Sequence, residues 1–130
     1  MRKRIAFGVL PLVLVLLIPA AAVPAHALDA HEAGIAAFNK GDYERALRHF
    51  REAQRKGVNT PNLCYNLGVT YYRLERYEQA ADAFRLLLGN SDWRHLALYN
   101  LGLIAEARGD SRRARDYYSR ASEAAGESRV

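Results

Sequence analysis

The sequence predicts an all-α protein, an α-solenoid of three antiparallel helix–turn–helix hairpins. Beyond residue 28, apolar residues recur every three or four positions, as on one face of a helix, and no segment alternates as a strand does. Small and aromatic residues also recur every 34 residues, which indicates a repeated supersecondary unit. The recurring sets are Gly34, Gly68 and Gly102; Ala46, Ala80 and Ala114; and Phe50, Phe84 and Tyr118.

Six helices follow from the places where capping residues, glycine and proline interrupt this periodicity. They are expected over 30–40, 43–56, 61–74, 77–88, about 92–108, and 111–125, in repeats over about 28–60, 61–94 and 95–125. Residues 126–130 are predicted to form a disordered tail, because nothing in their sequence ties them down.

The helix ends carry recognisable capping residues. Side chains that accept hydrogen bonds from the first-turn amides are expected at the starts, and glycines at the ends. The predicted N-caps are Asp29 (paired with Glu32 as in a capping box), Asp42, Thr60, Ser91 or Asp92, and Asp110; the predicted glycine stops are Gly41, Gly57, Gly89 and Gly109. Pro61 fits the first helical position, where its missing N–H costs no hydrogen bond.

The chain begins with the features of a secretory signal peptide over residues 1–27. Basic residues at Arg2–Arg4 precede an apolar run over Ile5–Ile18, and Ala25 and Ala27 form an A-x-A cleavage site. We expect cleavage after Ala27 and a mature protein that is periplasmic or secreted. The alternative is an uncleaved anchor, but the apolar run is shorter than the roughly 20 residues of a membrane span.

Charge and cysteine content exclude several classes of function. The formal net charge is +5, but without the three basic leader residues the 19 basic residues become 16 against 14 acidic ones, a charge of +2. This small, dispersed excess is no footprint for a nucleic acid. Cys64 has no second cysteine to pair with and is predicted to be a small buried hydrophobe, with an intermolecular disulfide as the alternative.

The recurring residues predict how each hairpin packs. The glycine falls on the first helix and the alanine on the second, so the two helices can approach closely. Glycine within a helix costs about 1 kcal/mol relative to alanine, so its recurrence indicates that close packing offsets this cost. The recurring aromatic rings, with Ala53, Leu87 and Ala121 one turn later, are predicted to fill the space between the helices.

These residues resemble the tetratricopeptide repeat family, whose 34-residue unit is a helix–turn–helix. The matching motifs are Leu67-Gly68 and Leu101-Gly102, Gly41-Asp42-Tyr43, and the pairs Ala46/Phe50 and Ala80/Phe84. The resemblance covers about residues 28–125. The chain departs from the family pattern in lacking the early tryptophan and the late proline of each repeat, in having Ala37 and Ala105 where Tyr71 keeps the aromatic residue, and in having Ser111 where Tyr43 and Tyr77 stand.

Polar residues replace apolar ones on the last predicted helix. Arg115 stands where Leu47 and Ala81 stand in the earlier repeats, and Ser122 stands where Gln54 and Leu88 stand. Solenoids need a polar face on the terminal repeat for solubility. The sequence therefore predicts that the stack ends at this helix.

The family resemblance implies that the first helices of the hairpins line a concave groove, which binds an extended peptide or a helix of another protein. The groove residues carried over by this resemblance are His31, Ile35, Phe38, Tyr65, Asn66, Val69, Tyr72, Arg73, Tyr99, Asn100, Leu103 and Glu106. Asparagine offers a peptide backbone both a donor and an acceptor. Alternatively, Asn66 and Asn100 only tie neighbouring helices together.

Some members of the family hold a terminal carboxylate with a clamp of basic residues and asparagines. The matching positions here are His31, Ile35, Asn66, Leu96 and Asn100, and only Asn66 keeps the pattern. A groove that reads an apolar or aromatic segment is therefore expected in place of a carboxylate clamp.

No catalytic, cofactor or metal site is predicted. His31-Glu32 lacks the second histidine of a zinc-peptidase motif, and His49 and His95 fall on different helices. The one enzymatic site that can be assembled on paper uses His31, His95 and Glu106. A structural alternative is a homo-oligomer formed through Tyr117, Tyr118 or the ends of the stack.

Overall fold

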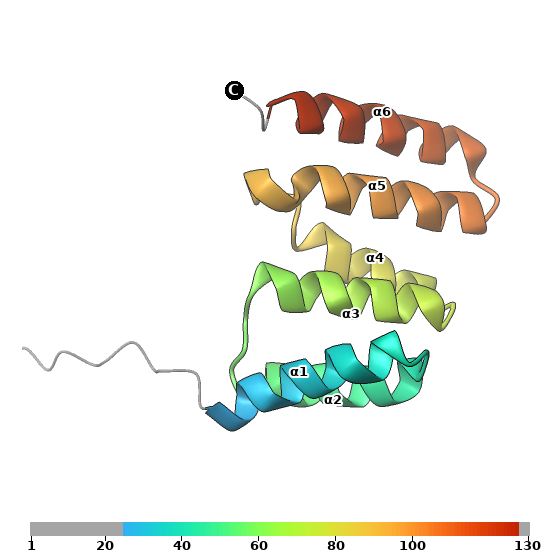
Figure 1. Cartoon of the computed structure of the whole chain (residues 1–130). Helices are drawn as coiled ribbons and strands as arrows, with labels where there is room; N and C mark the ends of the chain where they lie inside the picture. Colours follow the sequence, from blue (N-terminus) through green and yellow to red (C-terminus); the bar gives the residue numbers. More distant parts are fainter. Residues whose placement is uncertain (1–24, 128–130) are drawn as a thin grey trace, which may run out of the picture.

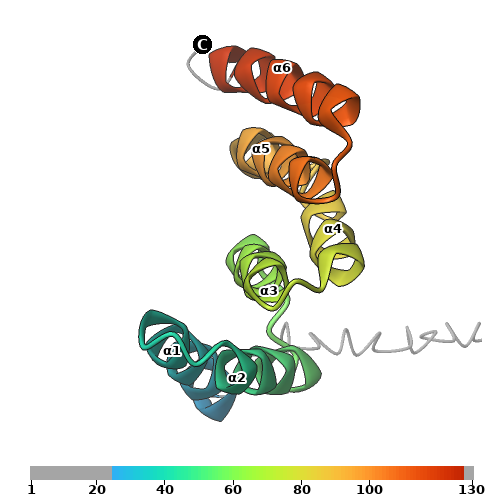
Figure 2. The same cartoon turned by 90° about the vertical axis from the view of Figure 1, so that its right-hand side faces the viewer.

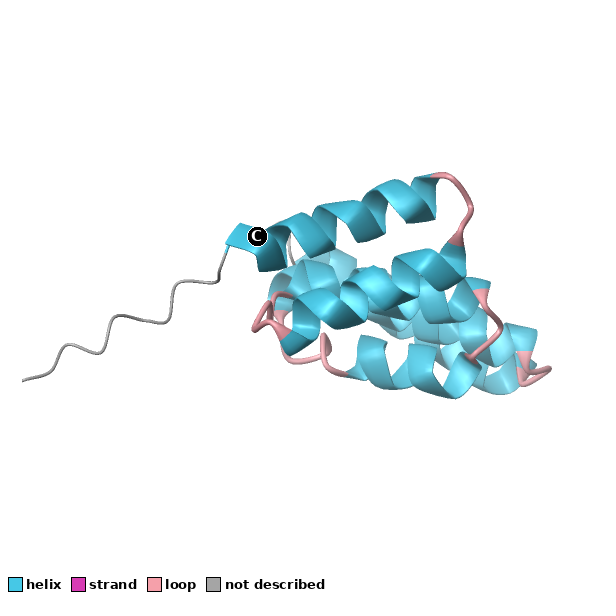
Figure 3. Cartoon of the chain, turned by 90° about the horizontal axis from the view of Figure 1, so that it is seen from below, coloured by secondary structure: helices cyan, strands magenta, loops and turns pink. Residues whose placement is uncertain are grey.

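Six helices stack as three hairpins in the computed structural model, which describes residues 25–127 (Figure 1). The helices are α1 (Ala25–Asn39), α2 (Tyr43–Arg55), α3 (Pro61–Arg73), α4 (Tyr77–Arg85), α5 (Ser91–Ala107) and α6 (Ser111–Glu127). Helices and short loops make up this part of the chain, and it contains no strand (Figure 3). The predicted α-solenoid is confirmed.

Successive hairpins are rotated relative to one another. Figure 2 shows α1 and α3 each beside the second helix of its hairpin, whereas α6 lies above α5. Each new first helix contacts both helices of the hairpin before it: α3 contacts α1 and α2, and α5 contacts α3 and α4. This arrangement leaves the first helices along one side of the stack.

The core is continuous from one hairpin to the next. Leu63 and Leu67 of α3 are buried in the same cluster as Phe50 of α2. Leu101 of α5 is buried in the cluster that contains Phe84 of α4. Each interface between repeats therefore buries apolar area that neither hairpin could bury alone, which is the source of stability in a solenoid.

The close approach predicted for the repeated glycines is present. A Cβ atom added to Gly68 would lie 2.7 Å from ring carbons of Phe84, and one added to Gly34 would lie 2.5 Å from ring carbons of Phe50. Gly102 meets Tyr118 in the same way, at 2.5 Å. Each glycine thus lets an aromatic ring of the second helix lie against the backbone of the first.

The turn inside each hairpin uses one left-handed residue. Gly41 has φ 78° and Gly109 has φ 79° at equivalent positions of the first and third repeats. The middle repeat places Glu75 there, with φ 57°. A side chain in this region costs roughly 1–2 kcal/mol, so the middle turn carries strain that the other two avoid.

Three predicted N-caps are confirmed by hydrogen bonds from the first-turn amides. Asp42 accepts from the Arg45 N–H at 3.1 Å. Thr60 Oγ1 accepts from the Leu63 N–H at 3.2 Å, and Asp110 Oδ1 accepts from the Arg113 N–H at 3.0 Å.

The start of the first helix was predicted wrongly. The helix begins at Ala25 and runs through Asp29, which therefore does not cap it. Alanine is the strongest helix former, and Ala27 and Ala30 are buried, so packing extends the helix toward the N-terminus. The predicted signal peptide falls mainly on residues 1–24, outside the described residues.

The ends around α4, α5 and α6 also differ from prediction. Neither Ser91 nor Asp92 caps α5; Asn90 does, because its extended backbone lets its side chain accept from the Asp92 N–H at 3.0 Å. The helix α4 ends at Arg85, and turns closed by hydrogen bonds between residues three positions apart carry the chain to Gly89. The predicted tail is helical at 126–127, because buried Ala124 anchors the last turn of α6; residues 128–130 lie outside the described part.

Candidate functional site

The predicted groove residues lie on α1, α3 and α5, the first helices of the three hairpins. Most are half-buried, so they form part of the surface and also pack against the core. The half-buried members are His31, Phe38, Tyr65, Asn66, Val69, Tyr72, Asn100 and Leu103; the exposed ones are Ile35, Arg73, Tyr99 and Glu106. The structure places them in three equivalent sets, one for each repeat.

A pair of aromatic rings recurs at the same place in every repeat. The first ring comes from the candidate groove and the second from the core of the hairpin. The pairs are His31–Phe50, Tyr65–Phe84 and Tyr99–Tyr118, with ring centroids 5.7, 5.8 and 5.5 Å apart. These distances are favourable for edge-on or tilted rings. In each pair the first ring therefore rests on the second, and the second ring packs against the first helix of the hairpin.

Large apolar side chains are exposed along the same helices. Leu28, Ile35 and Tyr99 are 49%, 38% and 52% exposed. Leu28 was not predicted as a groove residue, because the first helix was expected to begin at residue 30; its repeat equivalents are Asn62 of α3 and Leu96 of α5. Leu86, 71% exposed, lies just after α4 instead.

The two predicted groove asparagines are bonded differently. The Asn66 amide lies 3.1 Å from His31 Nε2 of α1 and donates to Asn62 Oδ1 at 2.9 Å. The Asn100 amide donates to the Leu96 carbonyl of its own helix at 2.8 Å. Asn66 therefore ties α3 to α1, as the structural alternative predicted, while Asn100 makes no such tie.

The bond to Asn66 agrees with a neutral His31. Burial of the imidazole lowers the pKa of His31, and the nearby carboxylate of Glu32 partly opposes this shift. An amide N–H can donate to Nε2 only when that nitrogen is unprotonated. The candidate groove therefore has an uncharged His31 ring in the first repeat near neutral pH.

Cation and ring contacts lie among the candidate groove residues nearest the hairpin turns. The Arg73 guanidinium lies over the ring of Tyr43, 5.8 Å from its centroid. The same ring meets Phe38 edge-on at 5.1 Å. One repeat later, Tyr72 and Tyr77 are 5.7 Å apart. Arg73 is thus held by the first hairpin while its side chain stays exposed.

The third repeat replaces this aromatic contact with a hydrogen bond between helices. Tyr118 Oη of α6 donates to Glu106 Oε2 of α5 at 2.8 Å. Burial, together with this bond to a carboxylate, raises the pKa of Tyr118 to about 12. The hydroxyl therefore stays protonated, and the bond persists, across the physiological pH range.

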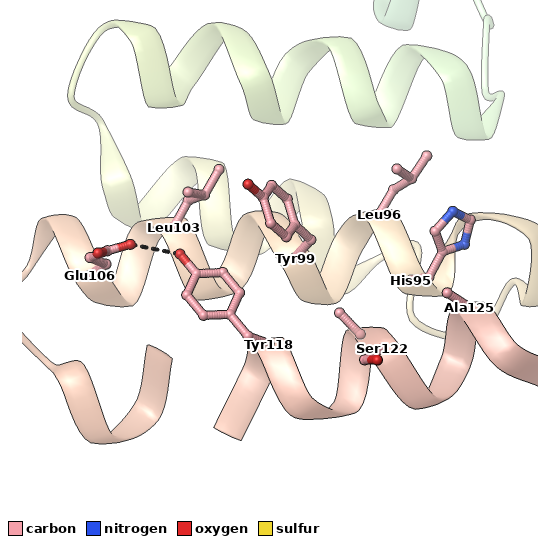
Figure 4. Close-up of a pocket in the computed structure, with 9 residues that line it drawn as sticks. His95, Leu96, Tyr99, Leu103, Glu106, Tyr118, Ser122 and Ala125 are labelled. Atoms are coloured by element: carbon pink, nitrogen blue, oxygen red, sulfur yellow. Dashed lines mark hydrogen bonds between the residues drawn. The ribbon is translucent and has the colours of Figure 1, made fainter. Parts of the chain in front are cut away.

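A pocket of about 600 Å³ opens between α5 and α6 at the C-terminal end of the stack (Figure 4). It gathers three predicted groove residues, Tyr99, Leu103 and Glu106. Its other wall comes from α6, where Tyr118 and Ser122 were not predicted as site residues. The 34-residue period was the signal that could have found them, because it pairs Tyr118 with Phe84 of α4 and Ser122 with Leu88 just after α4.

The structure does not bring together His31, His95 and Glu106, the one enzymatic site considered from the sequence. His31 lies on α1 and His95 and Glu106 on α5, and no contact joins these two helices within the described residues. Between residues 25 and 127, no group of three or more His, Cys, Asp and Glu side chains could hold a metal ion. In the same range, no helix is long and apolar enough to cross a membrane.

Cys64 and the two tyrosines considered for self-association have local roles. Cys64 is half-buried, not fully buried as predicted, because it borders a surface pocket of about 310 Å³ beside Leu86; burial raises the pKa of its thiol. Tyr117 packs against the α4–α5 cluster. Tyr118 lies against Gly102. Both tyrosines thus contribute to packing within the chain.

Comparison with known proteins gives consistent matches. Two family profiles, both described as Tetratricopeptide repeat, match residues 31–92 and 96–128. Photosystem I assembly protein Ycf3 of Prochlorococcus marinus is 29% identical over 107 residues, which cover 80% of this chain and 62% of that protein. The protein of the same name from Synechococcus sp. is 27% identical over 107 residues, which also cover 80% and 62%. The chain thus spans less than two thirds of these relatives.

A solved structure has the same fold. A mutant of MamA superposes with a TM-score of 0.70 over 78% of this chain and 74% of that one. The two sequences are 21% identical, so this likeness concerns the fold alone.

Proposed function

This chain belongs to the tetratricopeptide repeat family, and we propose that it is a non-catalytic adaptor that binds a segment of another protein along α1, α3 and α5. The observation that carries the proposal is the placement of exposed apolar side chains. Three of the four large apolar residues exposed in the described part, Leu28, Ile35 and Tyr99, belong to these helices. Exposed apolar surface gathered on one face is typical of an interaction site.

The composition of this face suits a segment with little charge. Arg73 and Glu106 are the exposed charged members of the candidate groove, and the His31 ring is neutral near physiological pH. Tyrosine rings give large contact area at low entropic cost, since few torsions are frozen on binding. An apolar or aromatic segment, extended or helical, therefore fits better than an acidic tail or a terminal carboxylate.

The relatives support a role in assembly. Two of them are named as assembly proteins, and an adaptor that holds one protein for another is compatible with such a role. The identity of the partner is not part of the proposal, because the chain matches only part of those relatives.

The groove assignment is tested by adding charge at exposed positions. Ile35→Glu and Tyr99→Glu should lower the partner recovered by cross-linking in the native cell at least tenfold, because each buries a carboxylate under the bound segment. Leu86→Glu is the matched control, since Leu86 is more exposed than either and lies off these helices. Recovery that is unchanged in both groove variants, or equally reduced in the control, would contradict the assignment.

We also propose that the protein is exported through the signal peptide at residues 1–27. The basic start, the apolar run and the A-x-A site support this proposal. Cleavage after Ala27 would shorten α1 by its first three residues, including buried Ala27. Mass spectrometry of the protein from fractionated cells should show a chain that begins at Leu28 outside the cytoplasm; an intact N-terminus would rule cleavage out.

A further inference from the structure

The pocket between α5 and α6 is called here the terminal pocket. The equivalent surface of the middle repeat, between α3 and α4, is covered by another helix. The 34-residue period relates its lining residues Tyr99, Tyr118 and Ser122 to Tyr65, Phe84 and Leu88 of the middle repeat. Those three residues pack in one cluster with α5 residues. The middle repeat therefore shows what this kind of surface accepts.

The cover over the middle repeat is a single helix, α5. Its Trp93 ring lies 5.6 Å from the Tyr65 ring, and its Leu101 is buried in the Phe84 cluster. The helix contacts both α3 and α4, so it seats in the angle between them. The helix α5 therefore fills this angle with Trp93 in its first turn and with the buried side chains of Ala97, Leu101 and Ile104.

The same surface stays open at the third repeat. Tyr99 is 52% exposed, whereas its equivalent Tyr65 is half-buried beneath Trp93. In Figure 4 the Tyr99 and Tyr118 rings and Ser122 lie around this opening. The volume of about 600 Å³ is large enough for a bulky aromatic side chain and its neighbours.

The polar end predicted from the sequence closes only part of the stack. Ser111 and Arg115 are exposed, as expected for a terminal face, but they border an adjoining hollow of about 260 Å³ toward the α5–α6 turn. This hollow shares Glu106 and Tyr118 with the terminal pocket. The terminal pocket extends the other way, toward the start of α5 and the end of α6. Its lining includes one charged carboxylate, Glu106, and no lysine or arginine. A partner face that is neutral or basic is therefore favoured over an acidic one.

We propose that the terminal pocket binds one amphipathic helix of a partner protein, seated on α5 and α6 as α5 is seated on α3 and α4. An aromatic residue of this helix contacts Tyr99, as Trp93 contacts Tyr65. A neutral or basic residue beside its apolar face lies near Glu106. This inference rests on the proposed adaptor function and assigns the C-terminal end of the groove to a helical segment.

The probe for this proposal is a labelled synthetic peptide with the sequence of residues 90–107, which contains α5 and its N-cap. We expect saturable binding to the full chain by fluorescence anisotropy, with a dissociation constant in the micromolar range. Replacing Trp93 in the peptide with alanine should weaken binding at least tenfold, which corresponds to about 1.4 kcal/mol. No binding at millimolar peptide, or equal binding of both peptides, would overturn the proposal.

A matched pair of variants locates the binding surface. Ser122 and Ser119 are both exposed on α6, but only Ser122 lines the pocket. Ser122→Arg should weaken peptide binding at least tenfold by filling the pocket, whereas Ser119→Arg should leave it unchanged. Equal effects would place the peptide elsewhere and refute the assignment.

Two further outcomes distinguish a partner helix in the terminal pocket from self-association and from binding in the candidate groove. If light scattering shows that the chain alone forms dimers that Ser122→Arg abolishes, the occupant is a second copy and the proposed partner helix is wrong. Ser122 lies outside the candidate groove, so failure of the peptide experiment leaves the cross-linking test of Ile35→Glu independent. Peptide binding that is lost in Ile35→Glu but kept in Ser122→Arg would assign the peptide to the groove and overturn the terminal pocket.

Discussion

Replacing Gly68 with alanine tests the packing that defines each hairpin. The added methyl group would lie 2.7 Å from Cε1 of Phe84, closer than carbon atoms approach without strain. The Phe84 ring is 0% exposed and is enclosed by the core cluster formed by residues of α3, α4 and α5, so it has little room to move. Overpacking of this kind costs about 1–3 kcal/mol, and the helix propensity of alanine returns about 1 kcal/mol. The difference between these two effects is about 0–2 kcal/mol, so we expect Gly68→Ala to lower the free energy of unfolding by up to about 2 kcal/mol.

The assay is urea unfolding followed by far-ultraviolet circular dichroism, with Gly126→Ala as the control. Gly126 lies in α6, and a Cβ there would meet nothing within 4 Å. Its replacement should stabilise the protein, by less than about 1 kcal/mol because the site is near a helix end. In a Phe84→Leu background, Gly68→Ala should cost less than in the parent, because the two sites are in contact. If Gly68→Ala stabilises the protein as Gly126→Ala does, the close-packing explanation is wrong.

Three other predictions follow from the turn and from two hydrogen bonds. Glu75→Gly should raise the free energy of unfolding by roughly 0.5–1 kcal/mol in the same urea assay, since glycine relieves the left-handed strain but loses more chain entropy; a destabilised variant would contradict this. Tyr118 should ionise near pH 12 in an ultraviolet titration, and Glu106→Gln should lower the pKa of Tyr118. Because the folded-state pKa is raised above the usual 10.0, the contribution of Tyr118 to stability is complete below pH 10 and is lost as the pH rises toward 12. The pKa of His31 is lowered, so the contribution of His31 to the free energy of unfolding is present above the usual value of 6.5 and is lost as the pH falls through the folded-state pKa. Asn66→Ala should make the free energy of unfolding less sensitive to acid between pH 7 and pH 4. An unchanged pH profile would count against the hydrogen bond between Asn66 and His31.

The architecture was predictable from the sequence because the same packing residues recur in all three repeats. Gly68 and Phe84 predicted a close contact that the structure shows, and Asp42 and Thr60 predicted caps that it also shows. The errors lie where tertiary packing decides between local alternatives. Burial of Ala27 carries α1 past Asp29, because burial outweighs one capping bond.

The candidate site was predictable by helix but not by contact. The period placed Tyr65 and Asn66 on the first helix of the middle hairpin, and one of the two alternatives was that Asn66 ties neighbouring helices together. The sequence did not identify His31 as the partner of Asn66. The terminal pocket was missed because the polar residues Arg115 and Ser122 predicted a terminal face along α6, although Ser122 lines the pocket. One face of a helix can be polar along part of its length and apolar along the rest.

The recurring ring pairs make the groove and the core thermodynamically inseparable. The Tyr65 ring borders the candidate groove on one side and contacts the buried Phe84 ring on the other, 5.8 Å between centroids. A ligand that restrains Tyr65 thereby also restrains the hairpin, so occupancy appears as added resistance to unfolding. At a ligand concentration about 100 times the dissociation constant, that increment is about 2.7 kcal/mol. Thermal melting of the whole stack would then serve as a detector of partners without any label.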